Sequence, residues 1–328
     1  MLGKLFGRGG ERPAADPHAL AVPRRQKSGV YALRALGDAR VLTLVEAAEA
    51  GDWEAVKAAS APFDLGRDHQ VLGELGELDG VQDWIGRAVE EDKEYRASAL
   101  LISGVRHVIW GWEARTADRA VNVTQEQWRV FHERLHIAEE QLLEAAELRP
   151  EWVTPWRRLL TSGRGMSLGP AVKETRLDAA LRRDPLDLET HIEWVSQLQP
   201  RWGGEPGQAL AFARDAFDGA PEGHRLGCVI AMAHIEDWVE SDDKNCLVAP
   251  EIQDELLDAA ERSILHPAYV SRPGWQEDFN IFAMALSLAA ERIALPRVFD
   301  QLRGACTSWP WKYMAQPEKA YARARRNA

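Results

Sequence analysis

The sequence predicts an all-α fold of stacked helical hairpins, an irregular α-solenoid. Three observations predict it. Apolar residues recur at the three- and four-residue spacing of amphipathic helices in several long segments. No segment shows the sustained alternation of apolar and polar residues, or the Asn-Gly turn, that indicates a β-hairpin. A short motif of paired alanines followed by proline recurs at intervals of 34 to 36 residues.

Two of the helices are predicted by clear local signals. A helix over 97–115 carries four apolar residues on one face, namely Leu101, Val105, Val108 and Trp112. A second helix begins at Thr124, because Thr124 and Gln127 have the spacing of a capping box, in which each side chain accepts a hydrogen bond from the other residue's backbone N–H. Beyond this cap, apolar residues from Phe131 to Ala145 continue at spacings of four and three.

The repeated motif indicates how these helices are arranged. Its clearest copies are Ala145–Pro150 and Ala179–Pro185, and weaker copies end at Pro221 and Pro267. Small residues let two antiparallel helices approach closely, and a proline just beyond a helix prevents its continuation. The period matches the 34-residue hairpin of tetratricopeptide (TPR) repeats, in which each hairpin covers the apolar face of the next. The last interval is longer because 241–245 form an inserted loop, so the array is irregular.

The domain organisation follows from composition along the chain. Residues 1–40 are expected to form a basic, largely flexible N-terminal segment, and residues 312–328 a basic C-terminal tail. Between them, 41–311 is expected to be a single TPR-like domain, since no linker rich in proline and serine divides it. A further hairpin is expected over 41–63. Residues 163–169 are expected to form a loop between hairpins, in which glycines adopt positive φ angles.

Composition excludes several classes of function. The chain has 328 residues, is 45% hydrophobic and carries a net charge of −11. Its two ends are basic and its body is acidic, so nucleic-acid binding by the body is not expected. No apolar run is long enough to cross a membrane. Three widely spaced cysteines without a C-x-x-C pair, Cys228, Cys246 and Cys306, indicate reduced thiols in a cytoplasmic protein, and no cofactor motif is present.

A set of short motifs, taken in order, resembles a known family. The motifs are Gly111–Arg115, Trp128–Phe131, Trp156–Leu160, Gly163–Met166, Gln199–Gly204, Phe212–Arg214 and Ala233–Glu236. Together they are similar to a bacterial family of uncharacterised proteins with a TPR-like helical domain of unknown function, over about residues 41–290. The resemblance implies a fold and no known reaction. One departure is Glu205-Pro206, where a serine cap is expected before the helix over 207–217.

The sharpest chemical motif is His132–His136, which has the H-E-x-x-H form of a zinc hydrolase. In such a motif His132 and His136 would bind the metal and Glu133 would activate water. Arg134 places a permanent cation between the two histidines, and no third ligand follows at the usual spacing. A structural interpretation is therefore favoured, in which His132 and His136 flank the packed face of a helix. A metal-dependent hydrolase is kept as the alternative function.

A second partial motif and the tryptophans complete the candidate residues. His234 and Glu236 match half of a zinc-deaminase motif, but the P-C-x-x-C half is missing, so a packing pair is expected. Most of the 13 tryptophans fall in apolar patterns. Those beside charges could line a groove, and the candidate ligand- or partner-binding residues are Trp112, Arg115, Trp156, Arg164, His191, Trp202, His234 and Glu236.

These observations favour a non-enzymatic cytoplasmic scaffold that binds a protein or peptide in the concave face of a TPR-like array. The partner is unidentified, no cofactor or metal is expected, and the oligomeric state stays open. A weaker alternative is attachment to an anionic membrane surface through the basic residues 1–23.

Overall fold

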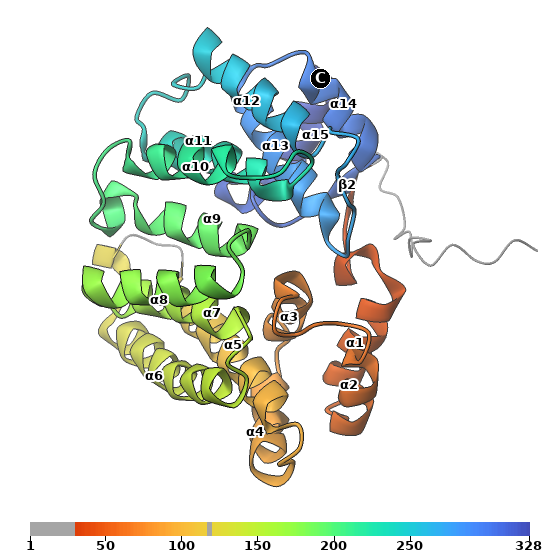
Figure 1. Cartoon of the computed structure of the whole chain (residues 1–328), viewed down its shortest axis with the longest axis vertical. Coiled ribbons are helices and arrows are strands. Elements are labelled where there is room, and N and C mark those ends of the chain that lie inside the picture. The colour runs from red at the N-terminus through yellow and green to blue at the C-terminus, as the bar shows by residue number, and fades with distance from the viewer. Residues whose placement is uncertain (1–29, 117–119) are drawn as a thin grey trace, which may run out of the picture.

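The computed structural model describes residues 30–116 and 120–328, and within these ranges the chain is almost entirely helical (Figure 1). Fifteen α-helices are joined by short loops and 3-10 turns, and the described strands are one pair of two residues each. The prediction of an all-α fold is confirmed. Residues 1–23, the basis of the membrane alternative, lie outside the described ranges. No helix in the described part is long and apolar enough to cross a membrane.

The helices fall into an N-terminal group, five hairpins and a C-terminal helix. The first group is α1 (Ala39–Glu49), α2 (Trp53–Ser60), α3 (His69–Gly76) and α4 (Val81–Glu91). The hairpins are α5 (Arg96–Arg115) with α6 (Gln125–Leu148), α7 (Thr154–Gly165) with α8 (Pro170–Arg183), α9 (Leu188–Gln197) with α10 (Gln208–Asp218), α11 (Cys228–Glu240) with α12 (Pro250–Arg262), and α13 (Trp275–Ala289) with α14 (Ala294–Leu302). The last helix is α15 (Pro317–Asn327).

Consecutive hairpins stack through their first helices. Helix α5 contacts α7, α7 contacts α9, α9 contacts α11 and α11 contacts α13, and Figure 1 shows them following one another up the molecule. The second helix of each hairpin packs against the first helix of its own hairpin. The alanine pairs of the repeated motif, Ala145 with Ala146 and Ala179 with Ala180, are buried in these contacts, where their small size permits close helix packing.

Local signals determine where helices begin. The capping box predicted at Thr124 is present, with Thr124 and Gln127 each accepting from the other's backbone N–H at the start of α6. Helix α10 has no capping side chain. Gly207, at a φ of 79°, precedes its first residue, and the Gln208 side chain accepts a hydrogen bond from the Glu205 backbone N–H instead. This arrangement explains why the serine expected before α10 is dispensable.

The glycines of 163–169 differ from the sequence prediction. Gly163 and Gly165 belong to α7, and neither has a positive φ; Ser167, in the following turn, has a φ of 54°. A methyl group on Gly165 would lie 2.6 Å from both Leu135 and Phe131 of α6. The prediction of a loop with positive-φ glycines was therefore wrong, because these glycines serve close packing between helices.

The ends of the described chain are packed onto the body. The strands β1 (Tyr31–Ala32) and β2 (Ala305–Cys306) pair in parallel, so Val30 and Tyr31 join the hydrophobic core of the C-terminal half. Residues 312–328, expected as a basic tail, contain α15, which contacts α13 and buries Tyr321 against Phe299 of α14 and Trp311. Of the expected flexible segment 1–40, the described residues 30–40 include β1, the 3-10 turn Ala35–Gly37 and the start of α1.

The described residues form two hydrophobic cores. One involves residues from α1 to α7, and the other involves residues from α9 to α15 together with Val30 and Tyr31. The boundary between the cores lies between α7 and α9. Charged side chains occupy this boundary, and they are the basis of the candidate site.

Candidate functional site

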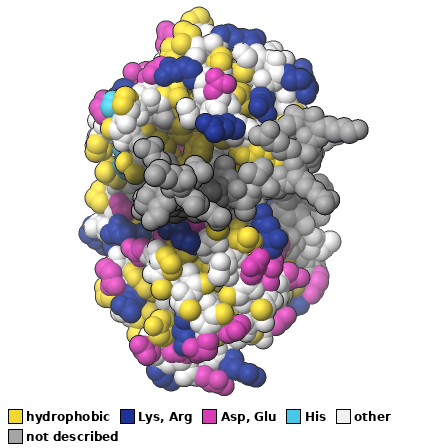
Figure 2. All heavy atoms as spheres, turned by 90° about the vertical axis from the view of Figure 1, so that its right-hand side faces the viewer, with side chains coloured by type: hydrophobic (Ala, Val, Ile, Leu, Met, Phe, Trp, Pro, Cys, Tyr) yellow, Lys and Arg dark blue, Asp and Glu magenta, His cyan; other side chains and the backbone are white. Residues whose placement is uncertain are grey.

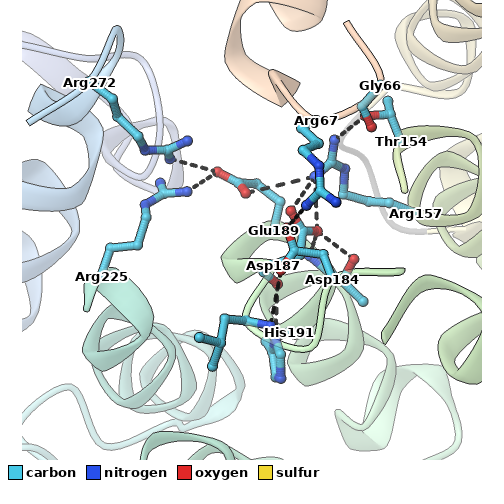
Figure 3. A network of polar contacts seen from close by, with 12 residues as sticks. Gly66, Arg67, Thr154, Arg157, Asp184, Asp187, Glu189, His191, Arg225 and Arg272 are labelled. Carbon is cyan, nitrogen blue, oxygen red and sulfur yellow. Dashed lines mark hydrogen bonds and ion pairs between the residues drawn. The ribbon is translucent and has the colours of Figure 1, made fainter. Parts of the chain in front are cut away.

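A network of buried ion pairs joins the two cores (Figure 3). At the start of α7, Arg157 donates to both carboxylate oxygens of Asp187 at 2.8 and 2.9 Å, and to the Thr154 hydroxyl at 2.7 Å. Asp187 in turn caps α9 by accepting from the Thr190 backbone N–H at 2.9 Å. Because one carboxylate holds both the arginine and the helix start, α7 and α9 are fixed relative to each other.

The network continues into the C-terminal core. Glu189 on α9 accepts from Arg225 at 2.6 Å and from Arg272 at 3.3 Å. Arg225 also donates to Asp278 on α13 at 2.5 and 3.0 Å. Burial alone would raise the pKa of Glu189, but the charges of Arg225, His69 and Arg157 lower that pKa to about 2. The Glu189 carboxylate is therefore charged and fully paired, and this part of the network has a structural role.

Arg158, next to Arg157 on α7, has a different environment. Its side chain is buried, with 8% of the residue exposed, yet among the described residues its guanidinium has no hydrogen-bond or ion-pair partner. Burial and the charge of Arg157 lower the pKa of Arg158 to about 10, so the group remains charged at neutral pH. A buried charge without a partner is costly, and arginine does not lose its proton to avoid that cost.

Other charged groups lie close to Arg158 and come from separate elements. Glu193 of α9 and Glu77, which follows α3, both act on the pKa of Arg158. Glu77 and Glu277 of α13 also act on the pKa of Lys312, in the 3-10 turn Trp311–Tyr313. We call Glu77, Arg158, Glu193, Glu277 and Lys312 the junction site, because their charges act on one another and they come from elements of both cores.

The junction site is accessible but poorly hydrated. Lys312 has an exposed side chain, yet desolvation lowers its pKa. Glu277 is partly exposed, and burial, together with the charges of Glu189 and Asp278, raises its pKa to about 8. At both positions solvent reaches part of the residue, while burial still disfavours the charged form of the side chain. Within the described chain, neither the Lys312 ammonium nor the Glu277 carboxylate makes an ion pair.

Four of the candidate residues predicted from the sequence come together beside the junction site. Trp112 meets Trp202 edge to face at 6.0 Å between ring centroids, and the Arg164 guanidinium lies 5.3 Å from each of these rings. The Arg115 guanidinium carbon lies 5.9 Å from the centroid of the Trp112 ring. Arg164 also forms an ion pair with Glu193 at 3.5 Å, which connects this aromatic stack to the junction site.

The other four candidates do not share a groove with the stack. The Trp156 ring packs against the Arg183 guanidinium, whose Cζ lies 4.9 Å from the ring centroid. His191 stacks on Phe212 with the ring centroids 5.6 Å apart, and its Nδ1 lies 2.8 Å from the Asp187 carbonyl oxygen. His234 contacts the Glu255 carboxylate at 2.8 Å. Glu236 is buried, where it accepts from Ser196 at 3.1 Å and Tyr313 at 2.6 Å and pairs with Arg201. Glu236 therefore borders the junction site through Tyr313, whereas His234 is a packing residue.

The H-E-x-x-H motif lies on the outer surface of α6. His132 and His136 are exposed, and Glu133 is paired with Arg129 at 2.9 Å. In the described residues, no group of three or more His, Cys, Asp or Glu side chains is placed to hold a metal ion. The two histidines thus have no third protein ligand in this part of the chain.

Sequence reasoning missed most of the junction site. Lys312 was assigned to a tail, and Glu277 and Glu77 belong to no recognisable motif. The one available signal was the arginine pair inside the motif Trp156–Leu160, since two adjacent arginines on a buried helix cannot both face solvent.

Comparisons with known proteins give no relative for this chain: no family model, no curated protein and no solved structure matches it.

Proposed function

We propose that the protein is a TPR-like, non-enzymatic scaffold that binds an extended segment of a partner protein along the concave side of its array, centred on the junction site. The free thiols Cys228, Cys246 and Cys306 support a reducing, cytoplasmic setting. The resemblance to the bacterial TPR-like family remains part of this proposal.

The unpartnered guanidinium of Arg158 is the observation that carries the proposal. Its neighbour Arg157 shows that the fold can place a carboxylate and a hydroxyl against a guanidinium at this depth, although the Arg157 Nε has no partner among the described residues. Leaving Arg158 unpaired weakens the fold, and such groups are retained in proteins where a ligand completes them. A carboxylate of a bound peptide would satisfy Arg158 and recover the desolvation cost on binding.

The neighbouring charges suggest what kind of segment binds. Lys312 and Arg158 present cations, while Glu77 presents a carboxylate whose charge acts on both of them. A peptide that carries both an acidic and a basic residue could pair with each set. The aromatic stack of Trp112, Arg164 and Trp202 would add a flat surface for an apolar side chain at one end.

The test is a selection of peptides from a displayed random library on the full chain, followed by measurement of each affinity by calorimetry. We expect the selected peptides to lose at least tenfold in affinity for Arg158→Met and for Lys312→Ala. The control His132→Ala, on the outer surface of α6, should bind them as the parent does. Peptides whose affinity is unchanged in both Arg158→Met and Lys312→Ala would contradict the proposal.

A further inference from the structure

A pocket separate from the junction site lies between α2 and α4. It is a pocket of about 620 Å³, and none of its lining residues belongs to the junction site or the aromatic stack. Two tryptophans, Trp53 and Trp84, form its apolar part. Four carboxylates also line it, from Glu54, Asp83, Glu91 and Asp92, together with a single cation, Arg87.

The tryptophans of this pocket are held in place. Their ring centroids are 6.3 Å apart at an interplanar angle of 44°, and the Trp53 indole N–H donates to Asp92 at 2.9 Å. Gly51 has a φ of 67°, and a methyl group at this position would come within 3.3 Å of the Trp84 ring. The glycine therefore lets the loop before α2 close against that indole, so the aromatic wall is preformed.

The electrostatic character of the pocket favours a cation. Four carboxylates face Arg87 and the adjacent Lys57, which leaves a local excess of two negative charges. Figure 2 views the molecule from the right-hand side of Figure 1, and acidic side chains lie there among basic and apolar ones over its lower half. An anionic ligand would be repelled here, whereas a cation gains from both the carboxylates and the electron-rich indole faces.

Lys57 shows that the surroundings of the pocket already hold such a group. Its ammonium is paired with Asp92 at 2.7 Å and Glu54 at 2.8 Å, and it lies 4.9 Å from the ring of Tyr95 and 6.0 Å from that of Trp53. Asp83 and Glu91, on the α4 side of the pocket, have no comparable cation among the described residues: Arg87 approaches Glu91 only to 3.9 Å, with both side chains exposed.

We propose that this pocket binds the basic side chain, lysine or arginine, of a partner polypeptide. The ammonium or guanidinium would pair with Asp83 and Glu91, and its aliphatic stem would lie against Trp84. The pocket would then be a second attachment point, separate from the junction site and independent of what binds there.

The test uses the full chain and three small probes: N-acetyl-arginine amide, N-acetyl-lysine amide and the neutral analogue N-acetyl-citrulline amide. The indole N–H signals of Trp53 and Trp84 in NMR spectra are assigned with Trp53→Phe and Trp84→Phe. We expect saturable shifts of these two signals with the arginine or lysine probe in the millimolar range. The citrulline probe should bind at least fivefold more weakly, because it lacks the charge.

Two double variants complete the experiment. Asp83→Asn with Glu91→Gln should weaken binding of the basic probes at least fivefold. The control, Glu251→Gln with Asp254→Asn, removes the same charge from exposed positions on α12 and should leave binding unchanged. Arg158→Met should also bind the probes as the parent does, which separates this site from the proposed function. Equal shifts with citrulline, or equal weakening in both double variants, would overturn the proposal.

Discussion

Arg157 and Arg158 are adjacent, identical in type and both buried, but only Arg157 is paired. Replacing Arg157 by methionine leaves the buried Asp187 carboxylate without its cation, while Glu189 keeps Arg225 and Arg272, so Arg157→Met should lower the free energy of unfolding by about 3–5 kcal/mol. Arg158→Met removes an unpaired charge and keeps similar volume. Its free energy of unfolding should equal that of the parent or exceed it by about 1 kcal/mol. Urea denaturation of both variants measures this difference, and a large loss in Arg158→Met would show that Arg158 is structural.

Glu277 makes the stability of the fold depend on pH. Burial raises its pKa from the ordinary 4.5 to about 8, so the folded protein binds a proton that the unfolded chain releases. The resulting stabilisation is fully present below pH 4.5, declines above it and is lost as pH rises through about 8. Glu277→Gln cannot titrate, so relative to the parent it should gain about 4 kcal/mol in free energy of unfolding between pH 5 and pH 9.

Urea denaturation of Glu277→Gln and the parent at pH 5, 7 and 9 measures this gain. Glu74, whose pKa is raised to about 7, has the same sign of effect but is present in both proteins and cancels in the difference. A difference between parent and variant that stays constant from pH 5 to 9 would mean that Glu277 titrates normally.

At the level of helices, two glycines should respond in opposite directions to the same change. Gly165→Ala places a methyl group 2.6 Å from Leu135 and Phe131, both of which are buried. We therefore expect the free energy of unfolding to fall by about 1–3 kcal/mol. Gly86 lies within α4, and a methyl group at this position points into open space. Gly86→Ala should therefore raise the free energy of unfolding by about 0.5–1 kcal/mol, because alanine has the higher helix propensity. Thermal unfolding by circular dichroism compares the two. Equal responses would contradict the packing role assigned to Gly165.

The sequence was a good guide to these elements where the signal is local. The capping box at Thr124 and the apolar stripe of 97–115 depend on neighbouring residues, and both predicted helices are present. The role of Gly165 could not be predicted, because it depends on how closely α7 approaches α6. The same holds for the C-terminal segment, whose basic composition suggested a tail although Tyr321 and Ala324 are buried against the body.

The candidate site was predictable to a smaller degree. Trp112, Arg164 and Trp202 could be associated because tryptophans beside arginines stand out in the sequence, and these three do meet. Glu277 and Lys312 are ordinary charged residues until the fold brings α13 and the turn Trp311–Tyr313 to the same place. Convergence of elements far apart in the chain leaves no mark on a single sequence.

At the scale of the whole molecule, the array is held together by contacts that a simple linear stack lacks. Strand β1, near the beginning of the described residues, pairs with β2, which lies more than 270 residues later in the sequence. The Arg67 guanidinium donates to the Asp184 carboxylate at 2.5 Å. The side-chain amide of Gln70 on α3 donates to the Gly274 carbonyl at 3.1 Å, before the start of α13. In Figure 1 the N-terminal helices accordingly lie beside the C-terminal part of the molecule. These contacts couple the two hydrophobic cores directly.

That coupling should be visible in how the protein unfolds. Arrays held only by nearest-neighbour contacts lose cooperativity and unfold in parts. Here the parent should unfold in one transition, because neither core can open without breaking contacts with the other.

Arg67→Ala combined with Gln70→Ala removes two of the long-range contacts on α3 and its preceding loop, and we expect the N-terminal core to unfold at lower urea than the C-terminal core. Hydrogen exchange followed by mass spectrometry resolves the two cores separately. A matched variant at exposed positions, Arg87→Ala with Gln301→Ala, should keep a single transition. If the Arg67→Ala, Gln70→Ala variant also unfolds in one step, these two contacts are not what couples the cores, and the coupling depends on the contacts that remain, among them the β1–β2 pairing and the buried network of Arg157, Glu189 and Arg225.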